Sequence, residues 1–309
     1  MNKHRIIFFG TPEFAVPSLQ ILIDSGSLAR LGINQSPIAV VTEPDRPAGR
    51  GKKLKYSSVK ELAQKNNLQI YQPEKISTLS SQLSALEPDV AIVVAYGQII
   101  PKEILEIPKF GFINLHPSLL PKYRGPSPIQ AAILNGDKVT GVTIIKLDEK
   151  MDHGPILAQQ ELEIANSKKQ KTNKIQIPID YENLSKELAK LGAELLIKTL
   201  PDYLNNKIKP INQDHTKATF TKLINKSDGL INWSEPVDLI ERKIRAYNPW
   251  PGAYTFINNK RLKICQAHIK YDKLIIDLVQ LEGKKIITWS EFIRGHKDII
   301  NLLDEKILI

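Results

Sequence analysis

The chain has 309 residues, of which 42% are hydrophobic and 25% are charged, as is ordinary for a soluble globular protein with a buried core. Its single cysteine, Cys265, excludes an internal disulfide and a cluster of thiolate metal ligands. The apolar run at the amino terminus is far too short for a signal peptide or a membrane span. We therefore expect a cytoplasmic protein that is not bound to a membrane.

Positive charge is in excess and is unevenly spread. The chain has 43 Lys and Arg against 33 Asp and Glu, a net charge of +10, which raises the prospect of a polyanionic partner. Between Arg242 and Lys270 there are seven basic residues and no acidic one, with four aromatic side chains among them. This mixture suits phosphates and bases, although a solvated face would have the same composition.

Strand and helix signals alternate from the start of the chain to Gln159. Strands are expected at residues 5–9, 38–41 and 89–95, and helices at residues 14–25, 59–66, 79–86 and 126–135. The alternation predicts the α/β class, with a Rossmann-like parallel sheet and right-handed crossovers. The first turn lacks Gly-x-Gly-x-x-Gly, so a dinucleotide is not indicated.

A basic segment at residues 42–55 interrupts this pattern. It contains two prolines, two glycines and five basic side chains, which is typical of an exposed and adaptable loop. Such a loop either serves solubility or contacts an anionic partner.

An amide and an imidazole lie together in the segment 111–125. Asn114 and His116 are two residues apart on an extended apolar run, so their side chains point to the same face of a strand. Prolines then end the strand, and the carboxyl ends of strands are where open α/β sheets bind ligands. The pair suits a carbonyl oxygen that becomes an oxyanion, although such side chains can also merely satisfy backbone groups.

A carboxylate follows in a turn between two predicted strands, at residues 142–147 and 155–159. If Asp152 faces His116, it favours the imidazolium and can help to pass a proton from an attacking amine. Asn114, His116 and Asp152 therefore form a candidate catalytic triad for acyl or one-carbon transfer, without a nucleophilic side chain.

The strings Asn-Leu-His-Pro-Ser-Leu-Leu-Pro at residues 114–121 and Met-Asp-His-Gly-Pro at residues 151–155 resemble those of the folate-dependent formyltransferases. The resemblance implies 10-formyltetrahydrofolate as the formyl donor and no metal. It implies that Asn114 and His116 stabilise the oxyanion, while Asp152 holds His116 and helps to relay the proton. It also implies a folate pocket lined by Tyr96, Gly97, Ser118, Leu119, Leu120 and Pro121.

Two further segments, at residues 42–55 and 242–252, resemble the branch of this family that acts on methionyl-tRNA. The resemblance implies methionyl-initiator tRNA as the acceptor and a protein that works as a monomer. The residues expected to contact the tRNA are Arg46, Arg50, Lys52, Lys53, Arg242 and Arg245.

The expected domain organisation is a formyltransferase domain at residues 1–200, a linker at 201–210 and a small domain at 211–309. A helix at residues 184–200 would close the first domain. The second shows strand signals at 230–233, 252–257, 261–268 and 274–281, with a helix at 240–247, and resembles a small β-barrel of the oligonucleotide-binding type. The polar, basic tract at 166–174 is interpreted as a flexible loop.

Three other functions stay open at this stage. Glycinamide ribonucleotide formyltransferases share the same two strings but are shorter and lack the basic loop and the second domain. Sugar-nucleotide formyltransferases can carry a similar second domain. The chain could also be an RNA-binding module with a degenerate enzyme domain, which the intact triad argues against.

Overall fold

The computed structural model describes residues 4–24, 36–48, 53–164, 179–296 and 307–308. The chain divides into two compact units, and it passes between them more than once. The first unit contains Met1–Gly125, Thr140–Leu162 and Lys186–Phe220, and the second contains Pro126–Val139, Glu163–Ser185 and Thr221–Ile309. The division into domains at 1–200, 201–210 and 211–309 stays a prediction. No helix in the described ranges is long and apolar enough to cross a membrane.

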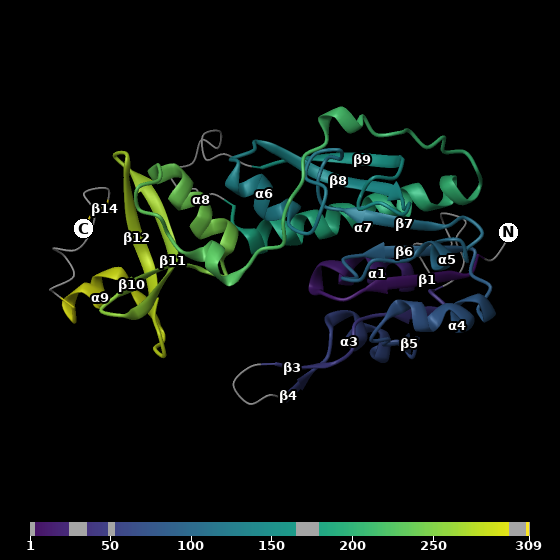
Figure 1. Ribbon diagram of the computed structural model, residues 1–309, viewed down its shortest axis with the longest axis horizontal. Helices are drawn as coiled ribbons and strands as arrows, with labels where there is room; N and C mark the ends of the chain where they lie inside the picture. Colours follow the sequence, from purple (N-terminus) through teal and green to yellow (C-terminus); the bar gives the residue numbers. More distant parts are fainter. Residues whose placement is uncertain (1–3, 25–35, 49–52, 165–178, 297–306, 309) are drawn as a thin grey trace. The chain divides into compact units, whose positions relative to one another are not determined.

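A seven-stranded sheet carries the elements of the candidate site (Figure 1). Its strands lie in the order β5-β2-β1-β6-β7-β8-β9. Their bounds are β1 (Ile6–Gly10), β2 (Ala39–Val41), β5 (Gln69–Tyr71), β6 (Val90–Val94), β7 (Phe112–His116), β8 (Val139–Lys146) and β9 (Ile156–Glu163). The first five strands of this order are parallel, as predicted, but β8 is antiparallel to β7. The sheet is therefore mostly parallel, which confirms the predicted Rossmann-like α/β fold. The antiparallel direction of β8 was not predicted, because side-chain alternation carries no information about strand direction.

Short helices connect these strands: η1 (Glu13–Ala15), α1 (Val16–Ile23), α3 (Ser58–Lys65), η2 (Ile76–Leu79), α4 (Ser80–Ala85), α5 (Lys102–Leu105) and α6 (Pro128–Leu134). The start of α3 shows how the sequence sets such a boundary. The Ser57 hydroxyl accepts a hydrogen bond from the Lys60 backbone N–H, which satisfies one of the free donors of the first turn.

The long helix α7 (Tyr181–Leu204) extends beyond the predicted end at residue 200, so the first residues assigned to a linker are helical. Pro201 lies inside the helix. A proline lacks an N–H, but its carbonyl still accepts, and Asn205 N–H donates to Pro201 O at 3.0 Å. Pro201 therefore does not end the helix. The 3-10 helices η3 (His215–Lys217) and η4 (Lys226–Gly229) follow in the chain.

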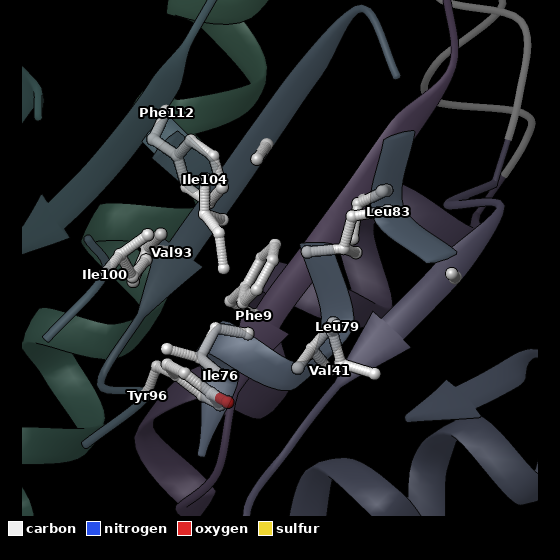
Figure 2. Close-up of a cluster of buried hydrophobic side chains, with 13 residues drawn as sticks. Phe9, Val41, Ile76, Leu79, Leu83, Val93, Tyr96, Ile100, Ile104 and Phe112 are labelled. Carbon is white, nitrogen blue, oxygen red and sulfur yellow. The ribbon is translucent and has the colours of Figure 1, made fainter. Parts of the chain in front are cut away.

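A cluster of buried hydrophobic side chains packs against the strands that lead to the site (Figure 2). The Phe9 ring of β1 lies 5.2 Å from the Phe112 ring of β7 and 5.4 Å, edge to face, from the Tyr96 ring. Leu83 and Ile104 pack against the same buried cluster. Phe9 thereby joins β7, the strand that carries Asn114, to the segment that follows β6, through large side chains removed from water.

The basic segment is a hairpin rather than the predicted loop. β3 (Arg46–Ala48) pairs antiparallel with β4 (Lys53–Lys55). At its base, Lys60 Nζ lies 2.5 Å from Asp45 Oδ2, and Gln72 Nε2 donates to Asp45 Oδ1 at 2.9 Å. The hydrogen bonds from Lys60 and then Gln72 lower the pKa of the Asp45 carboxyl. No strand was predicted here because these residues are mostly charged and do not alternate with apolar ones.

The second unit contains an antiparallel sheet in the order β10-β11-β12-β13, with β14 (Ile307–Leu308) parallel to β12. The bounds are β10 (Ala253–Ile257), β11 (Lys260–Lys270), β12 (Lys273–Leu281), β13 (Ile286–Thr288), α8 (Val237–Tyr247) and α9 (Trp289–Arg294). Tyr271 and Asp272, both with positive φ, form the two-residue turn between β11 and β12. An α/β fold followed by a smaller β unit is thus confirmed, whereas the strand predicted at 230–233 is only a bridge from Leu230 to Tyr254.

Candidate active site

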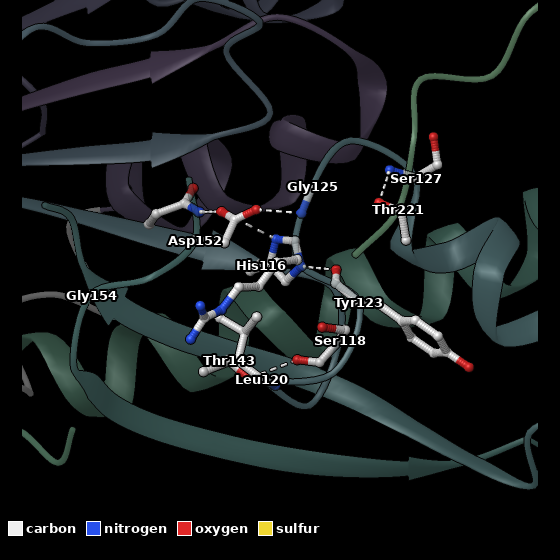
Figure 3. A network of polar contacts seen from close by, with 12 residues as sticks. His116, Ser118, Leu120, Tyr123, Gly125, Ser127, Thr143, Asp152, Gly154 and Thr221 are labelled. Atoms are coloured by element: carbon white, nitrogen blue, oxygen red, sulfur yellow. Dashed lines mark hydrogen bonds and ion pairs between the residues drawn. The ribbon is translucent and has the colours of Figure 1, made fainter. Parts of the chain in front are cut away.

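The three predicted catalytic side chains meet in the structure (Figure 3). Asn114 and His116 lie two residues apart on β7, and Asp152 comes from the turn between β8 and β9. Asp152 Oδ1 lies 3.4 Å from Asn114 Nδ2 and 3.6 Å from His116 Nδ1. The second carboxylate oxygen accepts a hydrogen bond of 2.8 Å from the Gly125 backbone N–H. One partly buried carboxylate therefore faces both the amide and the imidazole.

The imidazole is held by a backbone carbonyl. His116 Nε2 lies 2.9 Å from Tyr123 O, whereas the 3.6 Å between its Nδ1 and Asp152 is longer than a hydrogen bond. Because a carbonyl can only accept, Nε2 carries a proton in both the neutral and the charged ring. The atom that gains or loses a proton is thus Nδ1, on the side of Asp152.

The turn that presents Asp152 depends on close backbone contact. Asp152 has φ +47°, in the left-handed region that non-glycine residues seldom adopt. Two residues on, a Cβ at Gly154 would lie 1.8 Å from Lys146 O, so only glycine fits. Lys146 N–H donates to Pro155 O at 2.9 Å and closes the turn. The Asp152 carboxylate is therefore placed by the end of the β8–β9 pair.

The loop after β7 contains the predicted folate residues and is tied to β8 and β9. The Thr143 hydroxyl donates to Ser118 O at 2.6 Å and accepts from Leu120 N–H at 3.0 Å. Gln159 Nε2 donates to Leu120 O at 2.8 Å. The Ser118 hydroxyl donates to Lys122 O within the loop. Of the remaining predicted residues, Leu119 is half-buried and Pro121 follows a cis peptide bond.

The segment after β6 supplies the other two predicted folate residues. Tyr96 is buried, and its hydroxyl has no hydrogen-bond partner among the described residues. Burial, and then the charge of Glu43, raise the pKa of the Tyr96 phenol. Gly97 has φ +96°, and a Cβ there would lie 2.4 Å from Glu43 Oε1. Gly97 therefore lets the chain turn directly beside Glu43.

Comparison with known proteins agrees with this geometry. A family model described as formyl transferase matches residues 4–197, and a second, described as the formyl transferase C-terminal domain, matches residues 223–274. The curated methionyl-tRNA formyltransferase of Thermodesulfovibrio yellowstonii is 43% identical over 315 aligned residues, covering 94% of this chain and 96% of the relative. The chain belongs to the methionyl-tRNA formyltransferase family. The enzyme class predicted from the sequence is thereby confirmed.

Solved structures share the fold of this methionyl-tRNA formyltransferase family member. One from Clostridium thermocellum, itself a methionyl-tRNA formyltransferase, has a TM-score of 0.57 at 21% identity, covering 90% of this chain and 98% of that one. The N-formyltransferase from Helicobacter canadensis, solved with folinic acid and dTDP-3-aminofucose, has a TM-score of 0.62 at 20% identity, covering 92% and 98%. At these identities the likeness concerns the fold alone.

The structure describes only some of the residues of the basic segment that are predicted to contact tRNA. Arg46 pairs with Glu74 at 2.6 Å, and both side chains are 67% exposed. Arg50 and Lys52 lie outside the described residues, and the backbone of Lys53 begins β4. An ion pair as exposed as this one contributes little to stability, and a tRNA contact by Arg46 stays a prediction.

Arg242 and Arg245, the two residues of α8 predicted to contact tRNA, bind to groups in their own unit. Arg242 forms an ion pair with Asp238, one helical turn away. Arg245 Nε and Nη2 donate to the two carboxylate oxygens of the buried Glu241 at 2.6 and 2.9 Å, and Nη1 donates to Ile179 O at 2.8 Å. Arg245 thus stabilises the helix, and a tRNA contact by either residue stays a prediction.

Sequence reasoning missed a buried polar group beside Asp152. Arg124 donates through Nε and Nη2 to Gln213 Oε1 at 3.1 and 2.7 Å, and Nη2 lies 2.8 Å from His215 Nδ1. Burial, and then the charges of His153 and Arg124, lower the pKa of His215, so its neutral ring can accept. No local pattern connects Arg124 with Gln213, 89 residues later. Among the described residues no group of three or more His, Cys, Asp or Glu could hold a metal.

Proposed function

We propose that the chain transfers the formyl group of 10-formyltetrahydrofolate to the α-amine of methionyl-initiator tRNA, acting as a monomer in the cytoplasm. The observation that carries the proposal is the convergence of Asn114 and His116 on the Asp152 carboxylate, in a member of the methionyl-tRNA formyltransferase family. The Asn114 amide and the His116 imidazole can donate to a developing oxyanion, and the Asp152 carboxylate can accept a proton. This arrangement suits the attack of an amine on a formyl carbon.

The reaction needs no protein nucleophile. The uncharged amine attacks the formyl carbon, a new C–N bond forms, and the carbonyl oxygen becomes an oxyanion. Asn114 Nδ2 and the protonated His116 Nδ1 donate to that oxygen. Asp152 accepts the proton that the amine loses and passes it to N10 of the folate, and the bond from N10 to the formyl carbon breaks. Tetrahydrofolate leaves, and atoms and charges balance.

The folate pocket is proposed to include Tyr96, Gly97 and the loop Ser118, Leu119, Leu120 and Pro121. Support comes from the Tyr96 hydroxyl, a buried polar group without a partner among the described residues, which a polar ligand can satisfy. Folinic acid in the Helicobacter canadensis structure is a formylated folate bound to the same fold. The Ser118 hydroxyl already donates to Lys122 O within the loop. The loop is therefore proposed to contact the folate through its backbone and through Leu119.

Basic residues are proposed to contact the tRNA. Arg46, Arg50, Lys52 and Lys53 of the basic segment at residues 42–55 are proposed to contact the acceptor end, and Arg242 and Arg245 are proposed to contact the tRNA backbone. The net charge of +10 supports a polyanionic partner.

Replacing Tyr96 with Phe tests the folate pocket. We expect the KM for 10-formyltetrahydrofolate to rise about 5- to 30-fold with little change in kcat, because a hydrogen bond to bound folate is lost in ground and transition state alike. The free energy of unfolding should not fall, since the hydroxyl has no protein partner among the described residues. An unchanged KM would remove Tyr96 from the pocket.

A substrate comparison tests the function itself. Purified protein with 10-formyltetrahydrofolate is given methionyl-initiator tRNA, methionyl-elongator tRNA, glycinamide ribonucleotide or a 4-amino-sugar nucleotide, and formylated product is measured. We expect rapid formylation of the initiator tRNA alone. Formylation of only a small amine would overturn the proposed acceptor while leaving the triad intact.

A further inference from the structure

The segment 213–219 lies between the two stretches that the formyltransferase family models match, residues 4–197 and 223–274. Its side chains nevertheless reach the candidate active site. Gln213 is 5% exposed and lies within the first compact unit, together with the triad. A buried polar side chain is almost always hydrogen-bonded, so the groups that Gln213 binds show what holds this segment in place.

Gln213 holds the turn that presents Asp152. Its Nε2 donates to Asp152 O at 2.9 Å and to Gly154 O at 2.7 Å, on either side of His153. Its Oε1 accepts from Arg124, which is 3% exposed and directly precedes Gly125, the residue whose N–H binds the Asp152 carboxylate. The Gln213 amide thus connects the Asp152 backbone to Arg124, whose neighbour Gly125 donates to the Asp152 side chain.

Thr219 holds the residue that binds His116. Its hydroxyl accepts from Tyr123 N–H at 2.8 Å, and its carbonyl accepts from Arg124 N–H at 2.8 Å. Tyr123 has φ +62°, and its carbonyl is the partner of His116 Nε2 at 2.9 Å. Thr219 therefore fixes both N–H groups that flank the carbonyl holding the imidazole.

We propose that residues 213–219 form a catalytic strap, in which Gln213 and Thr219 are positioning residues that set the Asp152 carboxylate and the His116 ring relative to each other. The inference rests on the proposed function. A displacement of about 1 Å in such groups is enough to slow a reaction strongly, while substrate affinity is set elsewhere. The strap is thus expected to act on kcat and not on KM.

Thr219→Val and Thr219→Ser make the first test, in the full chain. Valine removes the acceptor for Tyr123 N–H, and we expect kcat for formyl transfer to fall about 5- to 10-fold with both KM values unchanged. Serine keeps the hydroxyl and should restore kcat. Thr78→Val is the matched control, because the exposed Thr78 hydroxyl lies outside the strap and donates only to Lys75 O in the described structure, so its loss should leave kcat unchanged.

Gln213→Glu makes the second test. The carboxylate still accepts from Arg124 but cannot donate to Asp152 O and Gly154 O, so we expect kcat to fall about 10-fold or more without a matching rise in KM. Normal kcat in both Thr219→Val and Gln213→Glu, or a Thr219→Ser enzyme as slow as Thr219→Val, would overturn the strap.

Asp152→Asn, assayed beside them, separates the two proposals. If Asp152→Asn is inactive and the strap variants are normal, only the strap is wrong. If Asp152→Asn retains full activity, the proposed mechanism itself fails, and the strap fails with it.

Discussion

Replacing Asp152 with Asn is expected to lower kcat for formyl transfer about 10²- to 10⁴-fold, the usual contribution of a positioned proton acceptor. Asparagine has nearly the same shape and its oxygen can still accept from Gly125 N–H, which now binds Asp152 Oδ2 at 2.8 Å. The turn should therefore persist. What is lost is the negative charge and the site that takes the proton from the attacking amine.

Steady-state rates with methionyl-initiator tRNA, together with the dissociation constant for 10-formyltetrahydrofolate, provide the measurement. Folate binding should change less than about threefold, because the predicted folate residues lie elsewhere. Asp148→Asn is a suitable control, since it makes the same change at a partly exposed position of the same turn, away from Asn114 and His116. An Asp152→Asn enzyme within tenfold of the normal kcat would contradict the assigned role.

Replacing Gly154 with Ala is expected to destabilise the first unit by about 4 kcal/mol or more. The added Cβ would lie 1.8 Å from Lys146 O and 3.0 Å from the Lys146 carbonyl carbon. Both are backbone atoms, so relief requires β8 and β9 to separate where Lys146 N–H donates to Pro155 O. Urea unfolding followed by fluorescence should show a lower midpoint for the variant.

Gly295→Ala is the matched control for that experiment. A Cβ there meets nothing nearer than Phe292 O at 3.7 Å, and the residue has φ −88°, which alanine adopts freely. Its free energy of unfolding should change by less than about 1 kcal/mol. Should Gly154→Ala unfold at the same urea concentration as the normal protein, the close packing of the turn would be refuted.

The sequence alone was sufficient for those features that depend on local spacing. Alternation of strand and helix signals predicted β1, β2, β6 and β7 in place. A strand repeat of two residues put Asn114 and His116 on one face, and the turn residues around Asp152 predicted a carboxylate between two strands. These features depend on backbone geometry over only a few residues. The types of the neighbouring residues determine that geometry.

Tertiary structure decided the contacts that join distant parts of the chain. It showed that β8 runs antiparallel to β7, that the basic segment is a hairpin, and that α7 continues through Pro201. It also showed that the Tyr123 carbonyl, not the Asp152 carboxylate, holds the His116 ring.

The last such contacts are those of Gln213 and Thr219, about 60 and 100 residues away from the residues that they hold. Apart from the Arg124 guanidinium, the groups that they bind belong to the backbone, which every residue carries and which no side-chain pattern marks. Spacing in the sequence therefore predicted the side chains that are proposed to react, whereas packing of distant segments fixed the atoms that orient them.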